Sequence, residues 1–139
     1  MNYNVFVVIL YRQYYEKVKH LAKAFIKLGL EERNSVGVLA FNCPEWFYSE
    51  LAAIHAGGII TGIYTTNSPE AVFHVLENSH ANIVIVDDSK QMEKIREIKH
   101  RLPLLKAIIQ LNESYEPYVK REDGYYRVRL TTTICNKIY

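Results

Sequence analysis

The chain has 139 residues, of which 49% are hydrophobic and 23% charged, so it has the length and composition of one globular domain with a buried core. A formal net charge of +2 is too small to favour nucleic acid as a partner. The two cysteines, Cys43 and Cys135, form no Cys-x-x-Cys pair, which argues against a zinc site or a disulfide scaffold and indicates a reducing compartment.

The chain begins with an apolar run over residues 5–11 that is too short to cross a bilayer and lacks the features of a signal peptide. We interpret residues 1–12 as an irregular or non-native start, either a short buried strand or a start left by truncation or splicing. A helix is predicted next, and it ends at Gly29, a residue suited to a left-handed C-cap. The apolar residues that fall on one face of this helix are Tyr14, Val18, Leu21, Ala22, Phe25 and Leu28.

Three further helices are predicted, each with a recognisable start. Asn42 with Glu45 matches a capping box, Ser68 precedes a proline, and Asp88 with Gln91 matches a second capping box. The first of these helices ends at the glycine pair 57–58, and the last ends before the proline at position 103. Their apolar positions are Trp46, Phe47, Leu51 and Ile54, then Val72, Val75 and Leu76 on the inner face, then Met92, Ile95 and Ile98.

Strands are predicted over residues 36–41, 59–64, 83–86 and 107–111, so that strands and helices alternate. This order predicts a three-layer α/β fold, in which a parallel sheet joined by right-handed crossovers is flanked by helices. The α/β unit spans residues 13–111. We expect residues 112–139 to form a divergent, poorly ordered tail, in which residues 128–134 have strand composition but no obvious partner.

The carboxyl ends of parallel strands usually open onto a ligand crevice. The candidate residues at this edge are Trp46, His55, Thr65, Thr66 and Asn67. Trp46 is either a packing anchor or the wall of an apolar ligand path. His55 either lines the crevice or is an ordinary, partly buried histidine.

No catalytic, cofactor-binding or metal-binding residue can be assigned from motifs. Gly57 and Gly62 have half the spacing of a phosphate-binding loop, but they precede the strand and no lysine follows. Asp87 and Asp88 could hold a ribose or a metal, although Asp88 is better explained as a helix cap. The basic residues form a solvated face or, alternatively, attract anionic lipid or a phosphorylated ligand; they are Lys19, Lys23 and Lys27, and Lys90, Lys94, Arg96, Lys99, His100, Arg101 and Lys106.

Several segments resemble adenylate-forming enzymes, namely Tyr14-Tyr15, Leu28-Gly29-Leu30, Phe41-Asn42-Cys43-Pro44-Glu45-Trp46 and Ala56-Gly57-Gly58. The run Gly62-Ile63-Tyr64-Thr65-Thr66-Asn67-Ser68-Pro69-Glu70-Ala71 is most similar to bubblegum-type long-chain acyl-CoA synthetases. The resemblance covers residues 14–111. It implies that a full-length protein joins a long-chain fatty acid to coenzyme A (CoA), using ATP and Mg²⁺ to make an acyl-adenylate first.

The residues that hold phosphate in this family follow a Ser/Thr-Gly-Thr-Thr-Gly pattern that these 139 residues do not contain. We therefore expect an N-terminal fragment of such a ligase that is inactive alone and binds none of these cofactors itself. The resemblance implies a cytoplasmic location, with peripheral attachment to the endoplasmic reticulum membrane as an option. The alternatives are a non-catalytic module that binds or modulates a full-length synthetase and, by fold analogy alone, a flavodoxin-like ligand-binding module.

Overall fold

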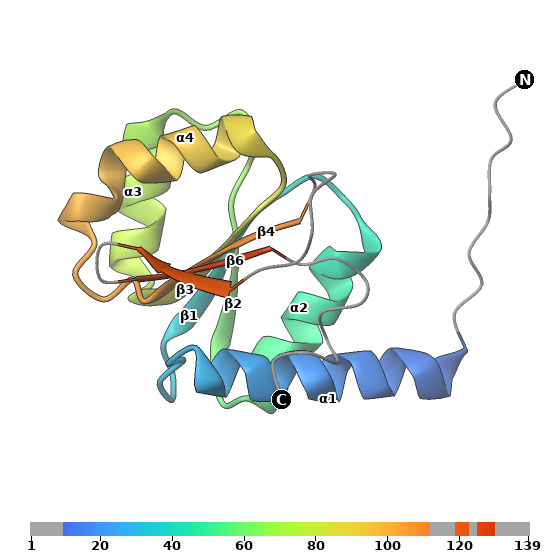
Figure 1. Cartoon of the computed structure of the whole chain (residues 1–139). Coiled ribbons are helices and arrows are strands. Elements are labelled where there is room, and N and C mark those ends of the chain that lie inside the picture. The colour runs from blue at the N-terminus through green and yellow to red at the C-terminus, as the bar shows by residue number, and fades with distance from the viewer. Residues whose placement is uncertain (1–9, 112–118, 123–124, 130–139) are drawn as a thin grey trace, which may run out of the picture.

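The computed structural model describes residues 10–111, 119–122 and 125–129, and it shows a sheet between two layers of helices (Figure 1). The layers are built by strand–helix alternation, as the sequence predicts. The elements in chain order are α1 (Tyr11–Lys27), β1 (Ser35–Leu39), α2 (Pro44–His55), β2 (Ile59–Gly62), α3 (Pro69–Asn78), β3 (Ala81–Val86), α4 (Ser89–Ile98), the 3₁₀ turn η1 (Lys99–Arg101), β4 (Ala107–Gln110), β5 (Val119–Glu122) and β6 (Tyr125–Arg129).

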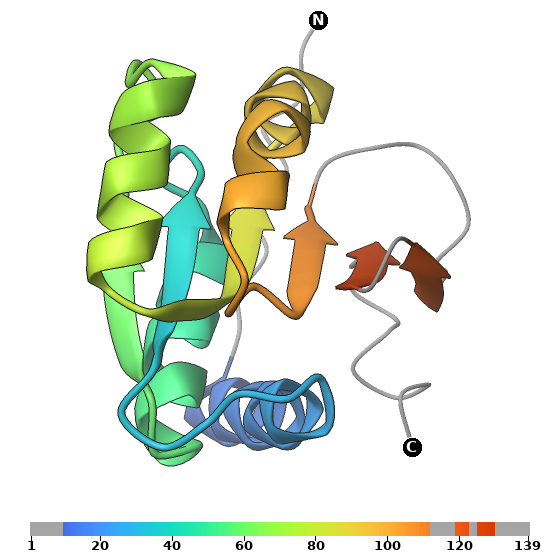
Figure 2. The ribbon, with the colours of Figure 1, turned by 90° about the vertical axis from the view of Figure 1, so that its left-hand side faces the viewer.

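The sheet has the strand order β2-β1-β3-β4-β6-β5 (Figure 2). Strands β2, β1, β3 and β4 are mutually parallel, which confirms the predicted parallel α/β sheet. β6 adds to β4 in parallel, and β5 pairs with β6 in antiparallel. No partner was predicted for the strand-like segment 128–134, whereas in the structure residues 125–129 form β6, which pairs with both β4 and β5. The remainder of that segment, residues 130–134, lies outside the described residues.

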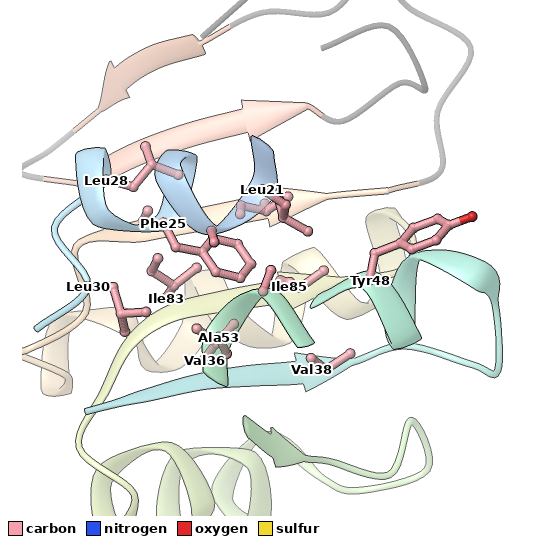
Figure 3. Close-up of a cluster of buried hydrophobic side chains, with 14 of the residues drawn as sticks. Leu21, Phe25, Leu28, Leu30, Val36, Val38, Tyr48, Ala53, Ile83 and Ile85 are labelled. Carbon is pink, nitrogen blue, oxygen red and sulfur yellow. The ribbon is translucent and has the colours of Figure 1, made fainter. Parts of the chain in front are cut away.

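Successive side chains of the central strand β3 point to opposite faces of the sheet and enter two separate cores. Ile83 and Ile85 join the core under α1 and α2 (Figure 3), whereas Val84 and Val86 join the core under α3 and α4. All six residues of β3 are buried. A strand covered on both faces needs this nearly continuous apolar sequence, as predicted for it.

Helices α3 and α4 begin where the sequence predicts. Ser68 accepts a hydrogen bond from the Ala71 backbone N–H at 3.3 Å, and Asp88 accepts one from the Gln91 N–H at 2.9 Å. The second capping box is only half formed, because the Gln91 Oε1 atom is buried without a hydrogen-bond partner. The apolar residues predicted to face inward are buried or partly buried, and they include Val72, Leu76, Met92, Ile95 and Ile98.

Helix α2 departs from the prediction at its start and on its buried face. Its N-cap is Cys43, with no side-chain hydrogen bond, so the predicted capping box of Asn42 with Glu45 is wrong. Asn42 lies one residue too early in the chain to cap a helix that starts at Pro44. The residues that α2 buries are Tyr48, Ser49, Ala52 and Ala53, while Phe47, Leu51 and Ile54 are exposed.

The packing of α2 against α1 explains which side it buries. The small side chains of Ala52 and Ala53 let α2 lie close to the sheet. The Tyr48 ring lies 4.9 Å from the Tyr14 ring of α1, centroid to centroid. Burial, followed by the negative charge of Glu50, raises the pKa of the Tyr14 hydroxyl. Small residues inside therefore leave the larger apolar residues of α2 outside.

The first two strands are shorter than predicted. β1 ends at Leu39 and β2 ends at Gly62, so that the segments after them turn away from the sheet. Phe41 and Tyr64, which the sequence places inside these strands, are exposed. β2 is also less buried than the other parallel strands, because it lies at the edge of the sheet.

Candidate functional site

A hollow of about 470 Å³ lies at the carboxyl ends of β1 and β2, the edge at which a parallel α/β sheet usually binds its ligand. Trp46, from the first turn of α2, lies against the end of β2: a Cβ atom at Gly62 would come within 3.3 Å of the Trp46 ring. A larger residue at position 62 would have to displace the Trp46 ring by a few tenths of an ångström. The residues that line the hollow are Ala40, Phe41, Asn42, Trp46, Gly62, Ile63, Tyr64 and Thr65.

The wall after β1 is held by Asp87, at the end of β3. Its Oδ2 atom accepts a hydrogen bond from the Phe41 backbone N–H at 3.2 Å, and its own N–H donates to the Leu39 carbonyl at 3.2 Å. The carboxylate is therefore used to fix a loop. This contact assigns a positioning role to one of the two acidic residues that could otherwise hold a ribose or a metal.

The wall after β2 is a turn held from three sides. The Asn67 N–H donates to the Tyr64 carbonyl at 3.0 Å, and the Ile63 N–H donates to Val38 at 2.9 Å. Lys94 reaches the turn from α4 and donates from Nζ to the carbonyls of Thr65 at 2.7 Å and Asn67 at 2.8 Å. Because a charged donor bridges two carbonyls, the backbone of this turn is fixed and the Tyr64 and Thr65 side chains stay at the rim.

The structure brings some of the predicted crevice residues together and leaves one apart. Trp46 and Thr65 line the hollow, and Asn67 lies in the same turn as Thr65. Thr66 is an exposed residue of that turn. His55 lies elsewhere, exposed at the last residue of α2, with its ring 6.4 Å from the Tyr15 ring of α1.

Two residues next to the hollow, Asp88 and Cys43, could suggest chemistry, and the structure supports a catalytic role for neither. Asp88 caps α4, as predicted. Burial raises the pKa of the Cys43 thiol, a hydrogen bond with the Trp46 backbone lowers it in part, and the charges of Glu45 and Asp87 raise it further. At neutral pH a thiol with a raised pKa stays protonated, so Cys43 is not poised as a nucleophile.

The described residues offer no metal centre and no phosphate cradle. No group of three or more histidine, cysteine, aspartate or glutamate residues converges within them. Gly57 ends α2 with a φ of +80°, and Gly62 lies at the far end of β2, so the two glycines do not form one loop. The donor set present does not fit Mg²⁺, and we assign it no step in a reaction here.

Much of the predicted basic region is paired within the chain. Arg101 contacts Glu70 through two hydrogen bonds of 2.6 and 2.9 Å, and Lys106 donates to the Gly29 carbonyl at 3.0 Å. Lys94 bridges the turn described above, and Arg96 pairs with Glu93. These contacts support a structural role for these four residues. Every helix among the described residues is too short or too polar to span a bilayer.

The sequence prediction missed four residues that shape the hollow: Phe41, Tyr64, Asp87 as an anchor, and Lys94. The first two could have been found as aromatic residues next to strand ends. Lys94 acts across 27 and 29 residues of sequence, and no local pattern reports such a contact. The hollow that results has aromatic walls and backbone polar groups, which suits an apolar or aromatic ligand portion.

Comparison with known sequences gives a consistent result. Residues 7–131 match the model of the family described as "AMP-binding enzyme", a range that includes every residue lining the hollow. The chain is 50% identical over 114 residues to the "Long-chain-fatty-acid--CoA ligase heimdall" of Drosophila melanogaster, which is 82% of this chain and 17% of that protein. It is 53% identical over 106 residues to the "Long-chain-fatty-acid--CoA ligase ACSBG1" of Bos taurus, which is 76% of this chain and 15% of that protein. The chain thus spans less than a fifth of the length of these relatives.

Solved structures share the fold. An anthranilate CoA ligase, AuaEII in complex with anthranoyl-AMP, superposes with a TM-score of 0.67 and 27% identity over 71% of this chain and 19% of its own. Apo MatB from Rhodopseudomonas palustris superposes with a TM-score of 0.67 and 18% identity, over 74% of this chain and 20% of its own. Both likenesses cover only a part of the larger protein.

Proposed function

This chain belongs to the AMP-binding enzyme family, and we propose that it is the N-terminal α/β part of a long-chain fatty acid–CoA ligase. The observation that carries the proposal is the 50% identity to the Drosophila ligase over 82% of the chain. The α/β architecture predicted from the sequence is present, and family members of known structure share it. A parallel sheet with an aromatic hollow at its carboxyl edge is consistent with a share in binding an apolar substrate.

The reaction proposed for the full-length ligase has two steps. The carboxylate of a fatty acid attacks the α-phosphorus of ATP, forms an acyl-adenylate and expels pyrophosphate. The thiol of CoA then attacks the acyl carbon, loses its proton, forms the thioester and expels AMP. Stabilising the charge that develops in both steps requires groups of the kind that the described residues lack, namely a phosphate cradle and a metal site.

Within such a ligase, we assign this chain a scaffold role and a share of the substrate site. Asp87 and Lys94 fix the two loops that carry Phe41, Tyr64 and Thr65, and Trp46 closes the hollow against Gly62. These side chains would exclude water from one portion of a ligand. ATP, CoA and fatty acid are expected to be bound with the rest of the ligase.

A segment exchange tests the proposal. The matching 114 residues of the Drosophila ligase are replaced by those of this chain, and acyl-CoA formation from palmitate, ATP, Mg²⁺ and CoA is measured. We expect the chimera to form palmitoyl-CoA, because half of the exchanged residues are unchanged and the fold is the same. A chimera that folds and stays inactive would contradict the proposal.

The 139-residue chain alone should give no palmitoyl-CoA above a blank without protein. Turnover by the isolated chain would refute its role as a non-catalytic part. The alternative of a module that binds or modulates a full-length synthetase has no support among the relatives, which are ligases by name. A cytoplasmic location stays part of the proposal, and no feature of the described residues favours attachment to the endoplasmic reticulum membrane.

A further inference from the structure

Helix α2 has apolar residues on two opposite sides, and only one side is covered. Tyr48, Ala52 and Ala53 pack into the core, while Phe47, Leu51 and Ile54 are 55%, 38% and 56% exposed. The exposed residues follow the spacing i, i+4, i+7, so they form one continuous line along the helix. We call Phe47, Leu51 and Ile54 the outer stripe of α2.

The other helices lack such a continuous line: α1 exposes Tyr11, Tyr15 and Ile26, but Ile26 lies about three to four turns away from the two tyrosines. Neither α3 nor α4 exposes a large hydrophobic side chain, and both bury their apolar residues in one core. A helix that is apolar on two sides is typical of the interior of a larger protein. α2 also contacts β2, an edge strand whose only partner among the described strands is β1. The side of the molecule formed by α2 and β2 therefore has two features that a further part of a protein could cover: the exposed outer stripe of α2 and the unpaired edge of β2.

The length of the relatives indicates what covers the outer stripe. This chain spans 17% of the Drosophila ligase and 19% of the anthranilate ligase, so more than four-fifths of either protein lies outside the matching segment. In a ligase of such length, this segment would be covalently joined to that remainder. A covalently connected partner has a high effective concentration and needs no large interface of its own to stay bound.

We propose that the outer stripe of α2 is the surface on which the remainder of the ligase docks onto this segment. The inference rests on the proposed function, because the occupant is a part of such a ligase. Docking would bury Phe47, Leu51 and Ile54 and turn α2 into an interior helix. The stripe then holds Trp46, which is on the same helix and lines the hollow, in a fixed position relative to the rest of the enzyme.

Hydroxyl-radical footprinting tests the proposal on the unmodified sequence, in the 139-residue chain and in the active chimera. Oxidation of Phe47 is measured against that of Phe73, which is buried in the described structure and serves as the internal reference. In the isolated chain we expect Phe47 to oxidise much faster than Phe73. In the chimera Phe47 should be protected to the level of Phe73.

Substitutions give an independent test with a matched control. Ile54→Lys is compared with Ile26→Lys on α1, since Ile26 is 57% exposed and is also an isoleucine on a helix. In the isolated chain both substitutions should leave the thermal midpoint unchanged. In the chimera Ile54→Lys should lower the yield of active ligase severalfold, because docking would bury an unpaired ammonium, whereas Ile26→Lys should not.

Several results would overturn the inference. Phe47 oxidation that is equally fast in both proteins would show that nothing docks there. Phe47 protection in the isolated chain would assign the stripe to a second copy if it depends on concentration, and to this chain's own residues if it does not. Should Ile54→Lys prevent folding of the chimera, Ile54→Ala must raise Phe47 oxidation in the folded chimera, or the inference fails. An inactive chimera with Phe47 protected would refute only the proposed function, and an active chimera with Phe47 exposed would refute only the docking stripe.

Discussion

The two faces of the sheet are built from the same strands, but the helices that cover them differ in two ways. They differ in whether a side chain caps the helix start and in whether large apolar side chains stay exposed. On one face, α3 and α4 are capped by Ser68 and Asp88, whose side chains accept hydrogen bonds from backbone N–H groups in the first turn of each helix. On the other face, α2 has Cys43 at its N-cap, where no side chain makes a capping hydrogen bond, and it carries the exposed outer stripe. Local sequence signals are thus sufficient for the α3/α4 face. On the α1/α2 face, the outer stripe stays exposed, and we assign it to a contact with the remainder of the ligase.

The largest expected effect compares one leucine of the α3/α4 core with the outer stripe. Leu76 is 1% exposed and its Cδ2 atom fills the space that a Cβ at Gly37 would need, at 2.5 Å. Leu76→Ala should lower the free energy of unfolding by about 2–5 kcal/mol, because it removes buried surface and leaves a cavity. Phe47→Ala in the isolated chain should change it by less than about 0.5 kcal/mol, as substitutions at exposed positions do.

Denaturant unfolding of the isolated chain measures both substitutions in the same assay. The comparison between the faces fails if Phe47→Ala destabilises the chain as strongly as Leu76→Ala. That result would mean that the outer stripe is already covered within the 139 residues.

The next effect concerns Lys94, which links α4 to the turn beside the hollow. Lys94→Met keeps most of the aliphatic stem but removes both bonds to the Thr65 and Asn67 carbonyls. We expect a loss of about 1.5–3 kcal/mol in the free energy of unfolding, the range for hydrogen bonds to charged groups. We also expect a red shift of tryptophan emission, since Trp46 is the single tryptophan of the chain and lines the hollow.

Lys90→Met, on the exposed surface of α4, is the matched control and should leave both readouts unchanged. An unchanged Trp46 emission in a folded Lys94→Met variant would show that the turn keeps its shape without the lysine. In that case the backbone hydrogen bonds from Asn67 to Tyr64 and from Ile63 to Val38 would be enough to fix this wall of the hollow.

A smaller effect separates the two kinds of helix start. Asp88→Ala should destabilise the chain by about 1 kcal/mol, the usual value of an N-cap, since the Gln91 N–H loses its acceptor. Asn42→Ala should be close to neutral, because Asn42 does not cap α2. Thermal or denaturant midpoints of the two variants test this contrast, with Asp88→Asn as a control that retains a capping oxygen. Equal destabilisation by the two alanine substitutions would restore the capping role that the sequence suggested for Asn42.

These contrasts also show what could be predicted from sequence. The alternation of strands and helices, the start of α3 and the cap of α4 are local features, and all of them are confirmed. The buried side of α2 was not predictable, because apolar residues occur on both sides and periodicity cannot tell which side meets the sheet. The decision is made by close packing of Ala52 and Ala53, which depends on α1 and the strands.

The same limit applies to the candidate site. Only the part that follows from topology could be predicted from the sequence. Trp46 and Thr65 could be placed at the carboxyl edge of the sheet, because that edge follows from topology. His55 lies at the opposite end of α2 from Trp46 and does not line this hollow. The anchors Asp87 and Lys94 act through contacts between distant segments, and no local pattern encodes them.

The smallest expected effect tests whether an ion pair on the surface, and not core packing, stabilises the α3/α4 face. Glu70 of α3 accepts two hydrogen bonds from Arg101, whose guanidinium lies 3.7 Å from the centre of the Phe73 ring. The hydrogen bond with Arg101, more than its charge, lowers the pKa of Glu70 below the ordinary glutamate value of 4.5. A lowered pKa in the folded state means that folding favours the ionised form. The contribution is therefore present above the ordinary value and is lost as the pH falls through the lowered one.

Glu70→Gln should accordingly reduce the thermal midpoint slightly at neutral pH, and the difference from the unmodified chain should vanish on acidification below that window. The difference should also shrink in high salt, because the pair is exposed and its charges are screened. Glu97→Gln, on the exposed surface of α4, controls for the loss of one negative charge. A difference that grows as the pH falls, or that survives high salt undiminished, would show that Glu70 stabilises this face by some means other than its bond to Arg101. If Glu70→Gln destabilised the chain as much as Leu76→Ala, the stability of the α3/α4 face would depend on an exposed ion pair as much as on its buried core.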